Sequence, residues 1–413
     1  MSYKRAIYKA TRNKQIYEAL TRAVANFRGN RARAFSKHPS IKNKAKRLKH
    51  VKEKALTNIE ALIKTCKDAV EEVGGYFYLA RNEEDAVKYV LEVVGTGKLV
   101  VKSKSLTCEE IGLNKALEEV GNTVVETDLG EFIIQQLNEK PMHILSPAIH
   151  IPKERVAKLF SHMAGREIPP KVEELVKFAR KHLRGYLTRA DVGVTGANAI
   201  AAETGTIFIV ENEGNARFVS NTPPTHIVVA GLEKLLPTLE DCLLLVEVAS
   251  VYAGYVAPSY VSMISGPSKT GDIEKLIVRG VHGPKELHVV LLDNGRSLMA
   301  RDPTYRQALY CVKCGGCLYE CPVYQLVGGY FGDRYFGGLG ALWALYASRK
   351  PDIALSIAYT CTLCGRCVKH CPLEIDTPSI VAKVREELTK KGFTPEGVKK
   401  LLEELERDGY PKF

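Results

Sequence analysis

Eight of the eleven cysteines fall in two motifs of identical spacing, which constrain the fold of this chain more than any other feature. The first motif reads CVKCGGCLYECP over residues 311–322, and the second reads CTLCGRCVKHCP over residues 361–372. Both follow C-x2-C-x2-C-x3-C-P, the spacing of bacterial-type ferredoxins. Three cysteines spaced three residues apart reach three irons of one cubane from a single turn, while the fourth points away and ligates another cubane. The spacing therefore predicts two [4Fe–4S] clusters.

Each cluster is expected to take three cysteines of one motif and the last cysteine of the other. The ligands predicted for cluster 1 are Cys311, Cys314, Cys317 and Cys371. The ligands predicted for cluster 2 are Cys321, Cys361, Cys364 and Cys367. The glycines within the two turns let the backbone approach the clusters and its amides bond the cluster sulfurs: Gly315, Gly316 and Gly365. Structural zinc is the alternative, but it needs neither four cysteines per motif nor the proline that follows each motif.

The remaining cysteines, Cys66, Cys108 and Cys242, stand singly in apolar or helical contexts, and we expect them to be buried thiols. The N-terminus lacks the apolar core of a signal peptide, and no run of about 18 apolar residues occurs. A long chain of this kind favours reduced cysteines that bind metal over a disulfide framework. We therefore expect a cytoplasmic protein without a transmembrane segment.

Periodicity divides the chain into three predicted domains. Residues 1–75 show a helical apolar stripe that ends at Gly74 and Gly75, and they form a basic helical arm. Residues 76–297 alternate strands with helices, which predicts a layered α/β domain with a mostly parallel sheet. Residues 298–413 contain both cysteine motifs with little strand signal, and they read as an α-helical ferredoxin domain. The expected strands of the middle domain are 76–80, 98–102, 122–127, 143–149, 191–194, 206–210, 226–231 and 288–292.

Positive charge is concentrated in the arm. Residues 1–55 hold 17 lysines and arginines against only Glu18 and Glu53, an excess of 15 charges in a chain whose net charge is +12. Such an arm fits a solvated helix face, a docking surface for an acidic partner, an anionic membrane surface, or a nucleic-acid contact. No zinc finger, RNA-binding aromatic pattern or helix-turn-helix signature accompanies it, so nucleic acid is not the favoured partner.

Four segments of the middle domain carry a resemblance to a known family. They read GVTGANAIAAETGTIFIVENEGNARFVSN (193–221), TPPTHIVVAG (222–231), GPSKTGDIE (266–274) and GVHGPKELHVVLLDNGR (280–296). Together they resemble the LUD family, named for lactate utilization. Joined to the two cysteine motifs, the chain resembles the lactate utilization protein B family. The resemblance implies a LUD domain of the sugar-phosphate isomerase/CoA-transferase-like type, and the same crossed ligand set on the eight cysteines.

The resemblance also implies a function and partners. A chain of this family is expected to be the electron-transfer subunit of a three-protein system that oxidises L-lactate to pyruvate. Its expected partners are a cysteine-rich protein related to heterodisulfide reductase subunits and a second, cluster-free LUD protein, with a downstream electron carrier. Because lactate oxidation releases two electrons and one cluster accepts one, such a chain needs another redox group or partner, and it is expected to be a subunit rather than a complete enzyme.

Candidate substrate-binding residues lie at predicted strand ends, where open α/β sheets bind ligands. We expect a pocket there, with a helix N-terminus near residues 195–198 to hold a carboxylate, and Glu203 as a candidate general base. The alternative is turn chemistry, with Asn198 as a cap and Glu203 paired with Arg217. Ser268, Thr270 and Asp272 either line a site or cap a helix at Ile273. The candidate pocket residues are Gly193, Gly196, Asn198, Glu203, Thr204 and Gly205.

The histidines of the middle domain show no metal-ligand spacing and are expected to be core or surface residues: His143, His150, His226, His282 and His288. No G-x-G-x-x-G follows a strand, so no dinucleotide or flavin fingerprint is present. Two other functions remain open. One is the electron-transfer subunit of another 2-hydroxy acid dehydrogenase or heterodisulfide-reductase-like complex. The other is a cluster-based redox sensor that binds nucleic acid through the arm.

Overall fold

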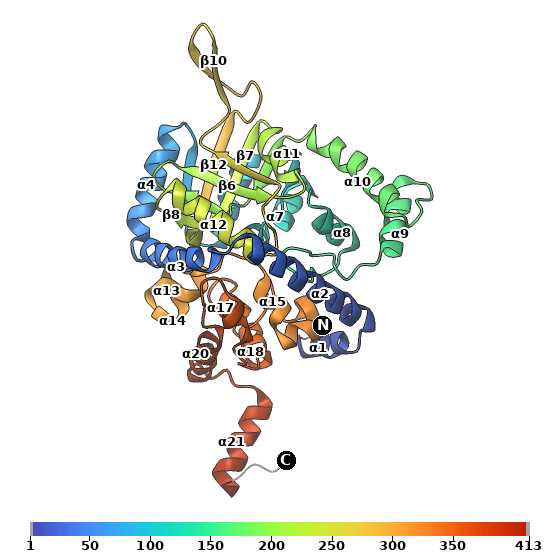
Figure 1. Cartoon of the computed structure of the whole chain (residues 1–413). Coiled ribbons are helices and arrows are strands. Elements are labelled where there is room, and N and C mark those ends of the chain that lie inside the picture. Colours follow the sequence, from blue (N-terminus) through green and yellow to red (C-terminus); the bar gives the residue numbers. More distant parts are fainter. Residues whose placement is uncertain (1–2, 410–413) are drawn as a thin grey trace.

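A six-stranded parallel sheet forms the centre of the computed structural model, which describes residues 3–409 (Figure 1). Its strand order is β1-β12-β7-β4-β2-β3, and every neighbouring pair is parallel. The inner strands are continuous buried runs of valine, isoleucine and leucine, as expected for a parallel sheet covered on both faces. The predicted layered, mostly parallel fold is confirmed. The strands are β1 (Tyr76–Ala80), β2 (Leu99–Lys102), β3 (Thr123–Glu126), β4 (Val192–Thr195), β7 (Thr225–Gly231) and β12 (Glu286–Leu292).

Helices cover one face of this sheet, and a smaller second sheet covers the other. The first face packs against α5 (Glu83–Val94), α6 (Leu106–Glu110) and α7 (Leu113–Glu119). The second sheet has the order β8-β5-β6-β9. Its strands are β5 (Ala199–Ala201), β6 (Thr206–Glu211), β8 (Leu235–Leu236) and β9 (Tyr260–Ile264).

The other elements of the middle segment extend from these layers. A hairpin of β10 (Lys269–Ile273) and β11 (Leu276–Arg279) projects from the body of the protein (Figure 1). Three helices form a separate lobe with its own apolar core beside β3: α8 (Leu129–Leu137), α9 (Lys153–Ala164) and α10 (Val172–Leu187). The remaining elements are α11 (Asn215–Asn221), η1 (Leu232–Lys234) and α12 (Leu239–Tyr252).

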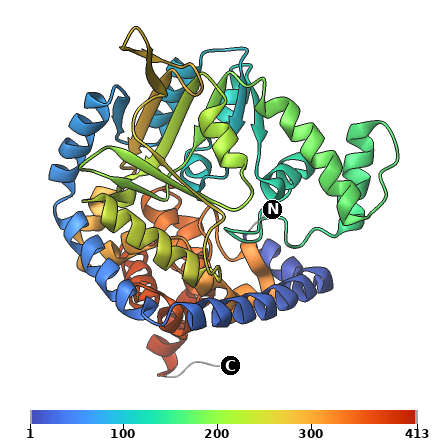
Figure 2. The ribbon, with the colours of Figure 1, turned by 45° about the horizontal axis from the view of Figure 1, so that its top comes forward.

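The N-terminal arm is helical and packs along the rest of the chain. It comprises α1 (Tyr3–Thr11), α2 (Lys14–Lys37), α3 (Ile41–Thr57) and α4 (Ile59–Glu72). Figure 2 shows these helices curving along the outer side of the molecule. The apolar stripe of α2 is buried, and α2 contacts the C-terminal helices that carry the first cysteine motif. Part of the arm's charge is used internally, since Arg28, Lys44 and Lys49 pair with Glu320, Glu247 and Glu374.

The C-terminal segment is helical, as predicted. It comprises α13 (Arg296–Arg301), α14 (Pro303–Arg306), η2 (Gln307–Tyr310), α15 (Gly316–Glu320), α16 (Pro322–Val327), η3 (Gly328–Tyr330), α17 (Gly340–Tyr346), α18 (Pro351–Thr360), α19 (Arg366–His370), α20 (Thr377–Lys390) and α21 (Glu396–Asp408). One continuous apolar core contains residues of the arm, the second sheet and these helices. The division into domains 1–75, 76–297 and 298–413 stays a prediction, and its end residues 1–2 and 410–413 lie outside the described residues. No helix among residues 3–409 is long and apolar enough to cross a membrane.

The strand expected at 143–149 is wrong. This apolar stretch is a loop whose chain reverses, with the amide of Met142 donating to the carbonyl of Pro147. Its buried side chains pack on the C-terminal helices instead of a neighbouring strand, and the His143 ring stacks on Tyr319 at 4.2 Å between centroids. The apolar residues of this stretch therefore reflect the burial of a loop and not a strand. Asn82 caps α5, because its side chain accepts a hydrogen bond from the Asp85 amide.

Candidate functional site

The two cysteine turns have the same backbone conformation. Lys313 and Leu363, each the residue before the second cysteine, have positive φ angles of 59° and 56°. The glycines after the second cysteines, Gly315 and Gly365, have φ angles of 74° and 73°. Left-handed residues turn the chain tightly, and glycine adopts them without steric cost. Each turn leads into a short helix, and these two helices, α15 and α19, pack against each other.

All eight cysteines of the motifs line one cavity. The glycine-rich segment that precedes α17 lies against this cavity, and it needs its small residues there. A Cβ atom added to Gly338 would stand 3.0 Å from the Cys361 sulfur. The rest of the lining is largely apolar, including Phe331, Phe336 and Leu373. The cavity is thus lined by thiols and apolar side chains, and it leaves no room for a larger residue at position 338.

The thiols influence one another mostly within two groups, although Cys367 also acts on Cys317. The pKa of Cys371 is raised to about 12, first by burial and then by Cys311 and Cys314. Burial also raises the pKa of Cys321 to about 11, with Cys361 and Cys367 as the nearby thiols. Buried thiols in such a crowd are deprotonated by metal coordination rather than by solvent. The donor set therefore fits sulfur-ligated metal clusters, and the grouping supports the crossed assignment, which stays a prediction.

The cysteines reach from the interior to the surface. Cys364 is the exposed member of the set. Cys314 also lines a second cavity, of about 310 Å³, which lies at the carboxyl edge of the parallel sheet. We call this cavity the sheet-edge pocket. Its wall includes the residues that follow β2, β4 and β7, together with Val312 and Lys313 of the first cysteine turn. It joins the parallel sheet to the predicted site of cluster 1.

The sheet-edge pocket contains charged groups of both signs. Lys104 donates to the carbonyl of Leu145 at 3.0 Å and lies 3.4 Å from the carboxylate of Asp128. Glu211 accepts the amides of Ala216 and Arg217 at 2.7 and 2.9 Å, but burial raises its pKa above the ordinary value. The remaining charged residues of the wall are Glu213, Glu233, Lys234 and Lys313.

The sequence prediction located this pocket only in part. Gly196 and Asn198 line it, and the Asn198 side-chain oxygen accepts the amide of Val210 at 2.9 Å. The expected helix N-terminus at 195–198 is wrong, because this stretch connects β4 to β5. The other four candidates, Gly193, Glu203, Thr204 and Gly205, are not among the lining residues. The lysines were missed, although each follows a strand or lies within a cysteine motif, which is the signal that identifies them.

Glu203 has a structural contact of its own. Its carboxylate accepts the amide of Leu239 at 2.8 Å, at the first turn of α12. It does not pair with Arg217, whose guanidinium lies 4.6 Å from the centroid of the Tyr260 ring. Glu203 does not line the sheet-edge pocket, so it cannot act as a general base on a ligand bound in that pocket. The interpretation of Glu203 as part of local turn structure is the one that the contacts favour.

Other candidate residues lie elsewhere. Thr270 and Asp272 bond each other at 2.8 Å on the exposed hairpin, and Ile273 ends β10 rather than starting a helix. Cys66, Cys108 and Cys242 are buried, as predicted. His282 is exposed. The other four histidines are buried: His143, His150, His226 and His288.

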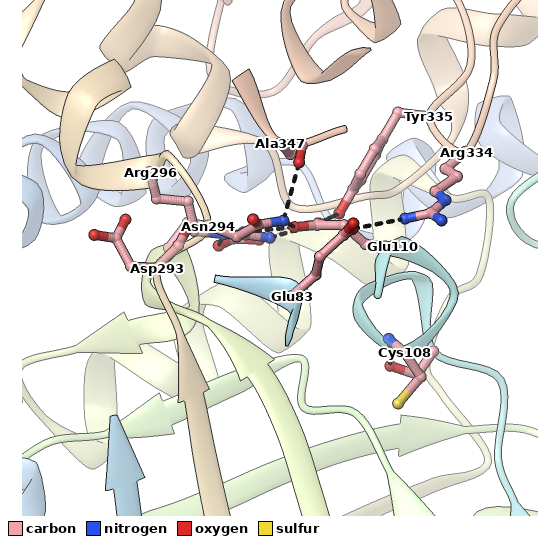
Figure 3. Close-up of polar contacts among 11 residues, drawn as sticks. Glu83, Cys108, Glu110, Asp293, Asn294, Arg296, Arg334, Tyr335 and Ala347 are labelled. Carbon is pink, nitrogen blue, oxygen red and sulfur yellow. Dashed lines mark hydrogen bonds and ion pairs between the residues drawn. The ribbon is translucent and has the colours of Figure 1, made fainter. Parts of the chain in front are cut away.

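A buried ion-pair network, absent from the sequence prediction, ties the sheet to the C-terminal helices (Figure 3). The Arg296 guanidinium donates to both carboxylate oxygens of Glu110 at 2.9 and 2.8 Å, and it also donates to Glu233. Asn294 and Tyr335 donate to the same Glu110 carboxylate. Glu110 ends the helix after β2, and Glu233 follows β7, so Arg296 joins two strand ends to the start of α13. The network therefore holds one wall of the sheet-edge pocket.

Comparisons with known proteins agree with this geometry. The LUD domain family matches residues 63–292, and the 4Fe-4S dicluster domain family matches residues 307–375. The second match covers all eight motif cysteines and identifies their cofactors as two [4Fe–4S] clusters in place of structural zinc.

Relatives match over most of their length. "Lactate utilization protein B" of Shouchella clausii is 38% identical over 83% of this chain and 71% of its own length. The protein of the same name from Bacillus cytotoxicus is 36% identical over 94% of this chain and 80% of its own length. The "Uncharacterized electron transport protein YkgF" of Escherichia coli is 35% identical over 84% of this chain and 72% of its own length. A DUF162 family protein from Deinococcus radiodurans covers 57% of this chain and 98% of its own at 15% identity and a TM-score of 0.32.

Proposed function

This chain belongs to the lactate utilization protein B family, in which a LUD domain precedes a 4Fe-4S dicluster domain, and from that premise we propose that it is the electron-transfer subunit of a complex that oxidises L-lactate to pyruvate. One observation of the structure carries the electron-transfer role. The cysteine ligands extend from the wall of the sheet-edge pocket, at Cys314, to the protein surface, at Cys364. Under the crossed assignment, cluster 1 lies beside the pocket and cluster 2 beside the surface.

The electron count suits this arrangement. Oxidation of a 2-hydroxy acid to a 2-oxo acid releases two electrons and two protons, and each [4Fe–4S] cluster takes up one electron at a time. The chain's own residues enclose the clusters in an apolar wall and position the turns that hold them. The proposed complex works in the cytoplasm. Its other members are a cysteine-rich, heterodisulfide-reductase-like subunit and a second LUD protein, with a downstream carrier that takes electrons from the exposed side.

Anaerobic reconstitution tests this proposal. The chain, loaded with iron and combined with its two proposed partners, is mixed with L-lactate, and cluster reduction is followed by EPR. We expect L-lactate to reduce the clusters with formation of pyruvate. A parallel experiment with glycolate tests another 2-hydroxy acid. Full cluster loading without any reduction by L-lactate would contradict the lactate assignment. Reduction by glycolate alone would point to another 2-hydroxy acid dehydrogenase.

Removal of cluster 2 tests the direction of transfer. In Cys321→Ser/Cys364→Ser, two of its predicted ligands are lost, whereas the ligands of cluster 1 remain. We expect L-lactate still to reduce the remaining cluster in the complex, while reduction of an external dye slows strongly because the exposed relay is missing. Stopped-flow absorbance separates these two steps. A dye-reduction rate equal to that of the unmodified complex would show that electrons leave by another route.

A further inference from the structure

The wall of the sheet-edge pocket contains a lysine that makes no ion pair within the described part of the chain. Lys234 lies in η1, directly after β7, and only 9% of its surface is exposed. Within residues 3–409, its ammonium has no hydrogen-bond or ion-pair partner. The neighbouring carboxylate of Glu233 is taken by Arg296, which also binds Glu110. Burial lowers the pKa of Lys234, and the negative charge of Glu233, which is shared with Arg296, opposes this effect only in part.

A second lysine lies close to the first. Lys313 belongs to the first cysteine turn, where its positive φ of 59° fixes an unusual backbone conformation. Its ammonium lies 4.4 Å from the ring centroid of Tyr335 and 4.5 Å from that of Trp343. The charge of Lys313 further lowers the pKa of Lys234, so the two ammonium groups repel each other. An anion bound between them would relieve this repulsion, which Glu233 and Cys311 offset only in part.

The rest of the wall limits which anion fits. Asp128, Glu211 and Glu213 line the same pocket, and Glu213 accepts the Leu129 amide at 3.3 Å. These carboxylates disfavour a doubly charged ligand such as phosphate, but they can accept a hydrogen bond from a hydroxyl group. A volume of about 310 Å³ is also at the small end of ligand pockets. A small monocarboxylate with an adjacent hydroxyl matches these groups.

We propose that the sheet-edge pocket binds a small 2-hydroxy carboxylate, whose carboxylate contacts Lys234 and Lys313 and whose hydroxyl faces the acidic side of the wall. The choice of L-lactate within this class rests on the proposed function. The ligand then lies against the turn that carries Cys314, next to the predicted position of cluster 1. Lys234 is a binding residue in this proposal, and Lys313 links the ligand to the cluster turn.

Equilibrium dialysis of the full chain, loaded with iron and kept anaerobic, tests this site without partner proteins. The probe is labelled L-lactate, and the competitors are unlabelled pyruvate, acetate and inorganic phosphate. We expect saturable binding of one lactate per chain, displaced by pyruvate and not by phosphate. Lys234→Met should weaken the affinity by about 10- to 100-fold, since a charge-assisted hydrogen bond is lost. Lys115→Met, at an exposed lysine of α7, is the matched control and should bind as the unmodified chain does.

The outcomes separate this proposal from the proposed function. Unchanged lactate binding in Lys234→Met with full iron content overturns the site, as does stronger binding of phosphate than of lactate. A change in the reduction potential of cluster 1 without a change in binding would mean that Lys234 only balances the cluster charge. A complex that oxidises L-lactate while the isolated chain binds none overturns the site alone. Binding by the chain without oxidation by the complex supports the site and contradicts the proposed function.

Discussion

Serine at both Cys311 and Cys371 is expected to leave about four irons per chain, which is one intact [4Fe–4S] cluster. These two cysteines come from different motifs, yet the crossed assignment places both on cluster 1. The structure supports that grouping, because burial and then the nearby Cys311 and Cys314 raise the pKa of the Cys371 thiol. Removing two ligands of one cluster should spare the other. Iron and sulfide counting on anaerobically purified protein, with EPR after dithionite reduction, gives the measurement.

The matched control replaces two cysteines of the same motif. Cys311→Ser/Cys321→Ser removes one ligand from each cluster under the crossed assignment, so iron content should fall toward zero. If each motif held its own cluster, the results would be reversed, with iron retained in the control and lost in Cys311→Ser/Cys371→Ser. A third variant, Cys321→Ser/Cys361→Ser, should retain cluster 1. Because this variant loses two ligands of cluster 2 only, retained iron would show that a double substitution does not by itself prevent iron loading.

The cluster ligands could be predicted because their geometry is local. Three cysteines in one turn fix their own spacing, and the structure repeats the same left-handed residues at Lys313 and Leu363. The parallel strands could be predicted for a similar reason, since each inner strand is a continuous apolar run. Their order could not, because β1 pairs with β12 across more than half of the chain.

The segment around His143 shows where sequence periodicity misleads. An apolar run of this length reads as a buried strand, but here it fills the space between the arm and the C-terminal helices. A Cβ at Gly315 would stand 2.8 Å from the His143 ring, so the loop and the cysteine turn are packed tightly together. Contacts of this kind depend on two segments far apart in the sequence. Gly196 and Asn198 could be predicted as pocket residues from their position after a strand. Lys234 also follows a strand, but its neighbours in the pocket wall, Val312 and Lys313, come from the distant cysteine turn.

Arg296→Met is expected to destabilise the protein by about 3–5 kcal/mol, the usual result of removing one partner of a buried ion pair. Arg296, Glu110 and Glu233 are almost fully excluded from solvent, with side-chain exposures of 0%, 0% and 1%. The guanidinium satisfies both carboxylates, so its loss leaves two buried negative charges without their main partner. The urea midpoint of the iron-loaded chain, measured anaerobically by far-UV circular dichroism, should fall accordingly. Arg301→Met, an exposed position of the same helix, should change stability by no more than about 0.5 kcal/mol.

A second substitution identifies the cause of that loss. Glu110→Gln/Arg296→Met removes one of the two unpaired carboxylate charges and should recover part of the lost stability. A double-mutant cycle measures this recovery as the coupling free energy between Glu110 and Arg296. A loss below about 1 kcal/mol in Arg296→Met would mean that water or protons replace the guanidinium easily, contrary to its burial. The same substitution also frees Glu233 beside Lys234. If the lysine then pairs with this carboxylate, lactate affinity should fall in Arg296→Met although no residue that contacts the ligand has changed, because the counter-ion supplied by the ligand is no longer needed.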